Sequence, residues 1–129
     1  MIGRLDEVVI DCQDTLLLAA FWQQLLGGTI QRQSPEWVAL HPPTGITVSF
    51  QRVPEVKTIK NRMHLDIDVD DLDVAANAAV LIGGSRIGSP AMDEHGGFQV
   101  MADPEGNEFC FVHGPTAIDH DRVDSSNVL

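Results

Sequence analysis

Hydrophobic and polar residues alternate strictly in residues 64–69, and residues 7–12 follow the same pattern except for Val9, which stands at a polar position. Successive side chains of a β-strand point to opposite faces of the sheet, so a period of two predicts a strand with one apolar and one polar face. The ionisable residues on the polar faces are Glu7 and Asp11 in the first stretch and His64, Asp66 and Asp68 in the second. Both strands are expected to turn these side chains away from the core.

A helix is expected after each of these strands. Asp14 and Asp71 follow the alternating stretches, where a carboxylate can accept hydrogen bonds from the free N–H groups of a first helical turn. Apolar residues at helical spacing then continue to the glycine pairs at 27–28 and 83–84, which suit the left-handed conformation after a helix. The chain therefore contains the same strand and capped helix twice.

Three further strand-like runs follow each helix, and the two halves can be aligned throughout. The runs cover residues 29–33, 36–41 and 46–53 in the first half and 85–89, 97–102 and 107–112 in the second. Four extra residues of the second half fall in a loop expected around 90–97. The predicted organisation is a first βαβββ module at 1–52, a linker at 53–62, a second βαβββ module at 63–113 and a flexible C-terminal tail at 114–129.

Three motifs in this arrangement carry a resemblance to a known superfamily. The chain has FW in its first helix, HLDIDVDDLD opening its second half and DPEGNEFCF near its end. In this respect it resembles the vicinal oxygen chelate superfamily of glyoxalases, bleomycin resistance proteins and dioxygenases, over residues 5–113. The resemblance implies an α+β fold in which paired βαβββ modules form a cup-shaped half-open barrel. It also implies a ligand or metal in the cup and a homodimer.

The resemblance further implies which side chains line the cup. The polar faces of the two opening strands would point inwards, while the aligned aromatic residues Trp37 and Phe98 would either line the cup or pack outwards. Metal-dependent members of the superfamily take ligands from the first and last strands of each module. The cup-lining candidates are Glu7, Asp11, Trp37, Ser49, His64, Asp66, Asp68, Phe98 and Cys110.

The ligand positions implied by the resemblance hold an unusual set of residues. His64 alone matches the glyoxalase pattern outright, because Ser49 is a poor ligand and Cys110 replaces a carboxylate. Glu7, His64 and Cys110 are left as candidate ligands for a divalent metal such as zinc, nickel, manganese or iron.

Two functions therefore stay open. One is a metal-independent binding protein of the bleomycin-resistance type, which holds a small organic molecule. The alternative is a divalent-metal-dependent lyase, isomerase or dioxygenase, in which the metal of a glyoxalase would stabilise an enediolate.

Composition narrows the partners of this chain of 129 residues, a length that suits one compact domain. Nineteen acidic residues against eight basic ones give a net charge of -11, which argues against nucleic acid and favours a neutral or cationic ligand. No apolar run is long enough for a bilayer, and the N-terminus lacks a signal-peptide pattern. The two cysteines form no CxxC motif or disulfide framework. A cytoplasmic protein without membrane partners is the default expectation.

Overall fold

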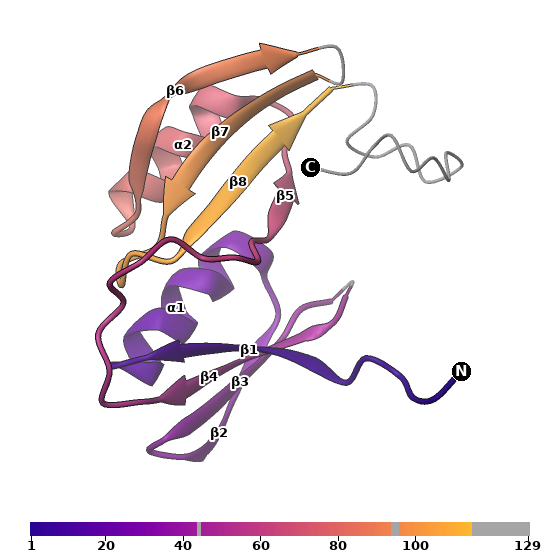
Figure 1. The fold of residues 1–129 in the computed structure, drawn as a ribbon, viewed down its shortest axis with the longest axis vertical. Helices are drawn as coiled ribbons and strands as arrows, with labels where there is room; N and C mark the ends of the chain where they lie inside the picture. The colour runs from indigo at the N-terminus through magenta and orange to yellow at the C-terminus, as the bar shows by residue number, and fades with distance from the viewer. Residues whose placement is uncertain (44, 94–95, 115–129) are drawn as a thin grey trace. The chain divides into compact units, whose positions relative to one another are not determined.

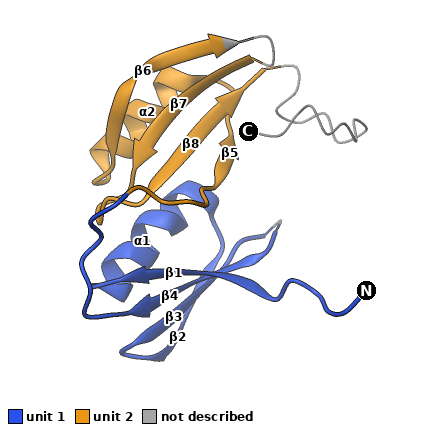
Figure 2. Ribbon diagram, viewed as in Figure 1, with its two compact units in different colours: residues 1–59 blue, residues 60–129 orange. Residues whose placement is uncertain are grey.

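The computed structural model describes residues 1–43, 45–93 and 96–114. The chain divides into two compact units, residues 1–59 and 60–129, and the division falls inside the predicted linker (Figure 2). Each unit is an open four-stranded sheet with one helix, so the predicted α+β class built from βαβββ modules is confirmed. A cup shared by the two modules stays a prediction.

In the first unit, a single helix covers one face of a mixed sheet (Figure 1). The strand order is β1-β4-β3-β2, in which β1 runs parallel to β4 and the other neighbours are antiparallel. The elements are β1 (Glu7–Cys12), α1 (Thr15–Leu26), β2 (Thr29–Ser34), β3 (Trp37–His41) and β4 (Thr47–Arg52).

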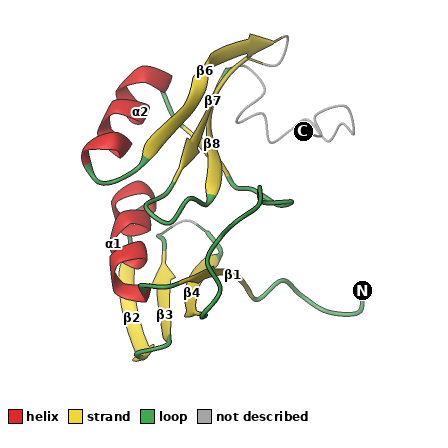
Figure 3. Cartoon of the chain, turned by 60° about the vertical axis from the view of Figure 1, so that its left-hand side comes forward, coloured by secondary structure: helices red, strands yellow, loops and turns green. Residues whose placement is uncertain are grey.

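The second unit repeats this topology, with the strand order β5-β8-β7-β6. Its helix again lies against one face of the sheet (Figure 3). The elements are β5 (Asp66–Asp68), α2 (Leu72–Leu81), β6 (Ser85–Asp93), β7 (Gly96–Ala102) and β8 (Glu108–His113).

Both helices begin at the predicted aspartates. The Asp14 carboxylate accepts a hydrogen bond from the Leu17 N–H at 3.0 Å, and Asp71 accepts one from the Val74 N–H at 3.0 Å. Each carboxylate satisfies a backbone donor that the first turn leaves free. The first helix ends at Gly27, which has φ 72° as predicted. No helix in the described part of the chain is long and apolar enough to cross a membrane.

The core of each unit lies between its helix and the apolar side of its sheet. In the first unit, Phe21 and Trp22 of α1 are buried, and their rings meet edge to face at 6.0 Å. In the second unit, the rings of Phe109 and Phe111 make the same kind of contact at 5.4 Å. Cys12 is buried in the first core, forms no disulfide, and donates from its thiol to the Gln51 carbonyl at 3.6 Å.

The second unit differs from the sequence prediction at two strands. β6 continues to Asp93, so residues 90–93 form strand instead of the expected loop, and a bulge between Ile87 and Ala91 absorbs the irregular sequence. Pro90 is tolerated because β6 is an edge strand. β5 has only three residues, so His64 precedes the strand. The predicted tail lies outside the described residues from 115 onwards.

Candidate functional site

Each sheet has one face covered by its helix and one face turned away from the helix, which we call the open face. Residues that are partners in neighbouring strands share a face, so the strand register identifies the side chains on each open face. In the first unit, Asp11 is the partner of Gln51, and Gln51 is the partner of Trp37. A carboxylate, an amide and an indole therefore form one row across three strands.

Two of the predicted ligand positions in the first unit are hydrogen-bonded to each other. The buried Ser49 hydroxyl donates to Glu7 Oε2 at 2.8 Å. Glu7 itself is half-buried on β1. The hydroxyl is neutral and is directed at the carboxylate, so Ser49 is a hydrogen-bond partner of Glu7.

The two tryptophans have different environments. Trp22 is 1 % exposed in the core, whereas Trp37 is half-buried on the open face. The register places Trp37 on the face opposite the helix, and its role in lining a cup stays a prediction. Its side chain is partly exposed there.

His41, at the end of β3, is exposed on the same open face, as expected for a surface histidine. Its Nδ1 is 3.1 Å from Thr47 Oγ1, and its Nε2 is 2.9 Å from Gln31 Oε1. His41 and Trp37 are four positions apart on β3, so their side chains share one face of the sheet.

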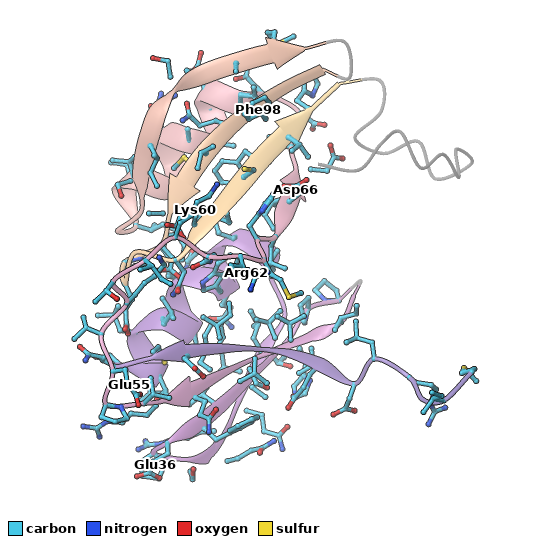
Figure 4. The ribbon with its side chains drawn as sticks, viewed as in Figure 1. Glu36, Glu55, Lys60, Arg62, Asp66 and Phe98 are labelled. Atoms are coloured by element: carbon cyan, nitrogen blue, oxygen red, sulfur yellow. The ribbon has the colours of Figure 1, made fainter. Side chains whose placement is uncertain are left out.

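The open face of the second unit repeats the row of the first. Asp68 is the partner of Val112, and Val112 is the partner of Phe98, so a carboxylate and an aromatic ring again flank a central strand. Asp68 is exposed and Phe98 is half-buried. Figure 4 shows Phe98 on β7 and Asp66 on β5. The predicted alignment of Trp37 with Phe98 is thus reproduced by the register.

Next to this row lies a compact group of three potential metal ligands, His64, Asp66 and Cys110. Their donor atoms all lie within 4.8 Å of one another, and His64 Nε2 is 3.3 Å from Asp66 Oδ1. Asp66 and Cys110 are partners in the parallel pair of β5 and β8. Asp66 was predicted to line the site but was not among the predicted metal ligands. Glu7, which was, belongs to the other unit, and its role as a ligand stays a prediction.

Burial controls the acid–base behaviour of this group. It raises the pKa of Asp66, and the imidazole of His64 partly opposes the shift through its charge and hydrogen bond. Burial, together with the negative charge of Asp66, also raises the pKa of the Cys110 thiol, against the pull of the Lys60 ammonium group. Both shifts favour the neutral forms of Asp66 and Cys110.

Backbone and side-chain bonds hold His64 beside β8. On one side, the Asn61 N–H donates to Glu108 Oε2 at 3.0 Å, and the Asn61 side-chain amide donates to the Glu108 carbonyl at 3.2 Å. On the other side, the Cys110 N–H donates to the Leu65 carbonyl at 2.9 Å. Glu108 therefore fixes the segment that carries His64.

The chain belongs to the glyoxalase-like domain family, whose sequence profile matches residues 7–112 and so spans both units. This finding confirms the resemblance to the vicinal oxygen chelate superfamily. A search of curated proteins found no significant match.

Solved structures of this fold superpose on the chain at low sequence identity. A glyoxalase/bleomycin resistance protein/dioxygenase family enzyme from Burkholderia phytofirmans PsJN has a TM-score of 0.73 at 24% identity, over 86% of this chain and 98% of that chain. A fosfomycin resistance protein from Listeria monocytogenes, in complex with Mn(II) and 1S,2S-dihydroxypropylphosphonic acid, has a TM-score of 0.73 at 14% identity, over 89% and 93%. A protein from Agrobacterium tumefaciens reaches 0.75 at 18%, over 88% and 99%. These similarities establish the fold.

Proposed function

We propose that the protein binds a small, planar organic molecule on the open faces of its sheets, prefers a cationic ligand, and needs no metal to do so. One observation carries the proposal: the same row of aspartate and aromatic ring occurs in both units. Asp11 and Trp37 form it in the first unit, and Asp68 and Phe98 form it in the second.

Such a row has two properties that a planar cation uses. The face of an aromatic ring attracts a cation by about 0.5–2 kcal/mol, depending on how far water is excluded. An exposed carboxylate adds about 0.2–1 kcal/mol. In the first unit, Asp11 and Trp37 are separated by one strand, which places their Cα atoms about 10 Å apart. A ligand of one or two fused rings fits this distance, and the net charge of -11 favours its approach.

Of the four ligand positions expected from metal-dependent relatives, the two in the first unit, Glu7 and Ser49, do not fit a metal. In the first unit, the Ser49 hydroxyl is neutral and buried, and it donates a hydrogen bond to Glu7. A serine hydroxyl is not among the donors that zinc usually takes, which are thiolate, imidazole and carboxylate. We therefore derive no catalytic step through a metal, and the metal-dependent lyase, isomerase or dioxygenase stays the second candidate.

Fluorescence offers a direct test, because Trp37 is half-buried and Trp22 is in the core. N-methylquinolinium is the cationic probe, and neutral quinoline is its matched control, with metal-stripped protein in both titrations. We expect saturable quenching by the cation, tighter than that by quinoline, and loss of this signal in Trp37→Phe. Calorimetry should show weaker binding to Trp37→Ala, by about 2- to 30-fold.

Charge variants distinguish the effect of the Asp11 carboxylate from that of the overall negative charge of the protein. Asp11→Asn should weaken binding of the cation about 1.5- to 5-fold and leave quinoline unchanged. Glu55→Gln removes the same charge from the segment after β4 (Figure 4) and should have no comparable effect. Quenching that never saturates, or binding that survives Trp37→Ala unchanged, would contradict the proposal. Binding that requires added metal would favour the second candidate.

A further inference from the structure

We propose that the second unit contains a divalent-cation site of its own, formed by His64, Asp66 and Cys110, which selects a thiophilic ion such as Zn²⁺ or Co²⁺ and needs no ligand from the first unit. This site goes beyond the proposed function, which concerns an organic molecule and requires no metal. The grounds are the positions of three donor atoms within 4.8 Å of one another.

The backbone brings the three donors together. His64 lies two residues before Asp66, and its Nε2 is 3.3 Å from Asp66 Oδ1. Asp66 and Cys110 are partners in neighbouring parallel strands, which places their side chains next to each other. Strand register therefore places Asp66 beside Cys110, and His64 joins them from the segment just before β5.

The distances suit a tetrahedral ion after a small adjustment. Donor atoms around zinc, at about 2.0–2.3 Å from the metal, are about 3.5 Å apart. The 3.3 Å between His64 Nε2 and Asp66 Oδ1 already matches this value. The Cys110 sulfur, at up to 4.8 Å from the others, has to move by about 1 Å. The side chains of His64 and Asp66 are 34% and 31% exposed, so rotation can supply part of the adjustment.

The chemistry of the donors determines which ion the site takes. One imidazole nitrogen, one carboxylate oxygen and one thiolate sulfur are ligands that zinc accepts, and a fourth position is left for water. Magnesium and calcium prefer oxygen ligands, so a site with sulfur and nitrogen discriminates against them. The charges of Asp66 and the Cys110 thiolate together neutralise a divalent ion.

The segment that carries His64 is also held in place before any ion binds. The two hydrogen bonds from Asn61 to Glu108 and the bond from the Cys110 N–H to the Leu65 carbonyl fix the backbone on both sides of His64. A ligand held in this way loses less conformational freedom on binding.

Cobalt titration of full-length, tag-free, metal-stripped protein tests the site. We expect one Co²⁺ per chain, with the visible bands of tetrahedral cobalt and a near-ultraviolet band from thiolate to cobalt. Zn²⁺ should displace the cobalt, and excess Mg²⁺ should not. Cys110→Ser should abolish the thiolate band. Asp66→Asn and His64→Ala should each weaken cobalt binding by more than about tenfold, since loss of even an outer partner of a metal ligand costs 10- to 100-fold.

Matched variants show whether the effect belongs to these three residues. Cys12→Ala removes the other thiol, and Asp68→Asn removes the next acidic residue on β5. Glu7→Gln removes the carboxylate of the first unit. All three should keep the cobalt spectrum, and circular dichroism should show that every variant is folded.

Three results would overturn the site: no saturable thiolate band in the unchanged protein, a band that survives Cys110→Ser, or a spectrum lost in Glu7→Gln but kept in Asp66→Asn. Quinolinium binding is measured separately on metal-stripped protein, so the two proposals can fail independently.

Discussion

Gln99 offers the most demanding test of how the second unit is held together. Its side chain is fully buried on the helix-covered side of β7. Its Oε1 accepts a hydrogen bond from Arg86 Nη1 at 3.0 Å, and its Nε2 lies 3.2 Å from the Gly88 carbonyl and 3.4 Å from the Ile87 carbonyl. The amide therefore holds the bulge of β6, in the strand next to the one that carries Phe98.

Gln99→Leu keeps the size of the side chain and removes every one of these bonds. Loss of the charge-assisted bond from Arg86 costs about 1.5–3 kcal/mol, and each bond to a bulge carbonyl contributes about 0.5–1.5 kcal/mol. Burial of the more apolar leucine offsets part of this loss. Arg86 also keeps Asp73 and Asn77 as partners, at 3.1 and 3.0 Å. The free energy of unfolding should fall by about 2–4 kcal/mol.

Urea unfolding, followed by circular dichroism, measures this change as a shift of the midpoint at constant slope. Gln33→Leu makes the same chemical change at an exposed position of β2 and should stay within about 0.5 kcal/mol. In a double-mutant cycle with Arg86→Met, the two substitutions should couple by at least about 1 kcal/mol. A loss below about 1 kcal/mol in Gln99→Leu, without coupling, would refute the structural role of this amide.

Four further predictions follow from single features of the chain. Asp71→Ala removes the cap of α2 and should lower the free energy of unfolding by about 1 kcal/mol in urea titrations; no change would mean that the cap is unimportant. A Cβ at Gly28, which has φ 93°, would lie 2.0 Å from the His41 carbonyl oxygen, so Gly28→Ala should cost more than about 2 kcal/mol, whereas Gly45→Ala, with open space around it, should be near neutral; equal effects would contradict this geometry. The pKa of Asp66 is raised in the folded chain, so its stabilising contribution is present at low pH and is lost as the pH rises through the raised pKa. Metal-free Asp66→Asn should therefore be more stable than the unchanged protein at pH 7 and equal to it below the ordinary carboxyl pKa of about 3.9, and a difference that is larger in acid would reverse this reasoning. The homodimer implied by the family resemblance predicts twice the chain mass in sedimentation equilibrium, and a monomer at all concentrations would exclude it.

Local sequence patterns were sufficient for much of the fold. The period of two gave the faces of β1 and β5, and the aspartates at 14 and 71 gave the helix starts, because strand faces and caps depend on neighbouring residues. The extension of β6 to Asp93 was not predicted. Gly88 and Pro90 interrupt its alternation, and the strand forms because β7 pairs with it on both sides of the bulge.

For the site residues too, the sequence predicted local features but not contacts that depend on strand pairing. The sequence identified Glu7, Ser49, His64 and Cys110 as notable, but not which of them meet. The Ser49–Glu7 bond and the proximity of Asp66 to Cys110 depend on pairing between strands about 40 residues apart. Such register is set by the packing of a whole sheet, so it can be inferred from sequence only after the repeat has been aligned.

The repeat itself explains why a group of potential metal ligands occurs in only one unit of the described structure. His64, Asp66 and Cys110 correspond, by register, to Glu7, Val9 and Ser49. The backbone arrangement is the same, but valine and serine replace the carboxylate and the thiol. The first unit therefore retains one charged donor, Glu7, which accepts a hydrogen bond from the serine hydroxyl. The aspartate and aromatic row, in contrast, is kept in both units. A binding surface that depends on a ring and a carboxylate is therefore compatible with both copies, whereas a thiophilic cation site is compatible only with the second.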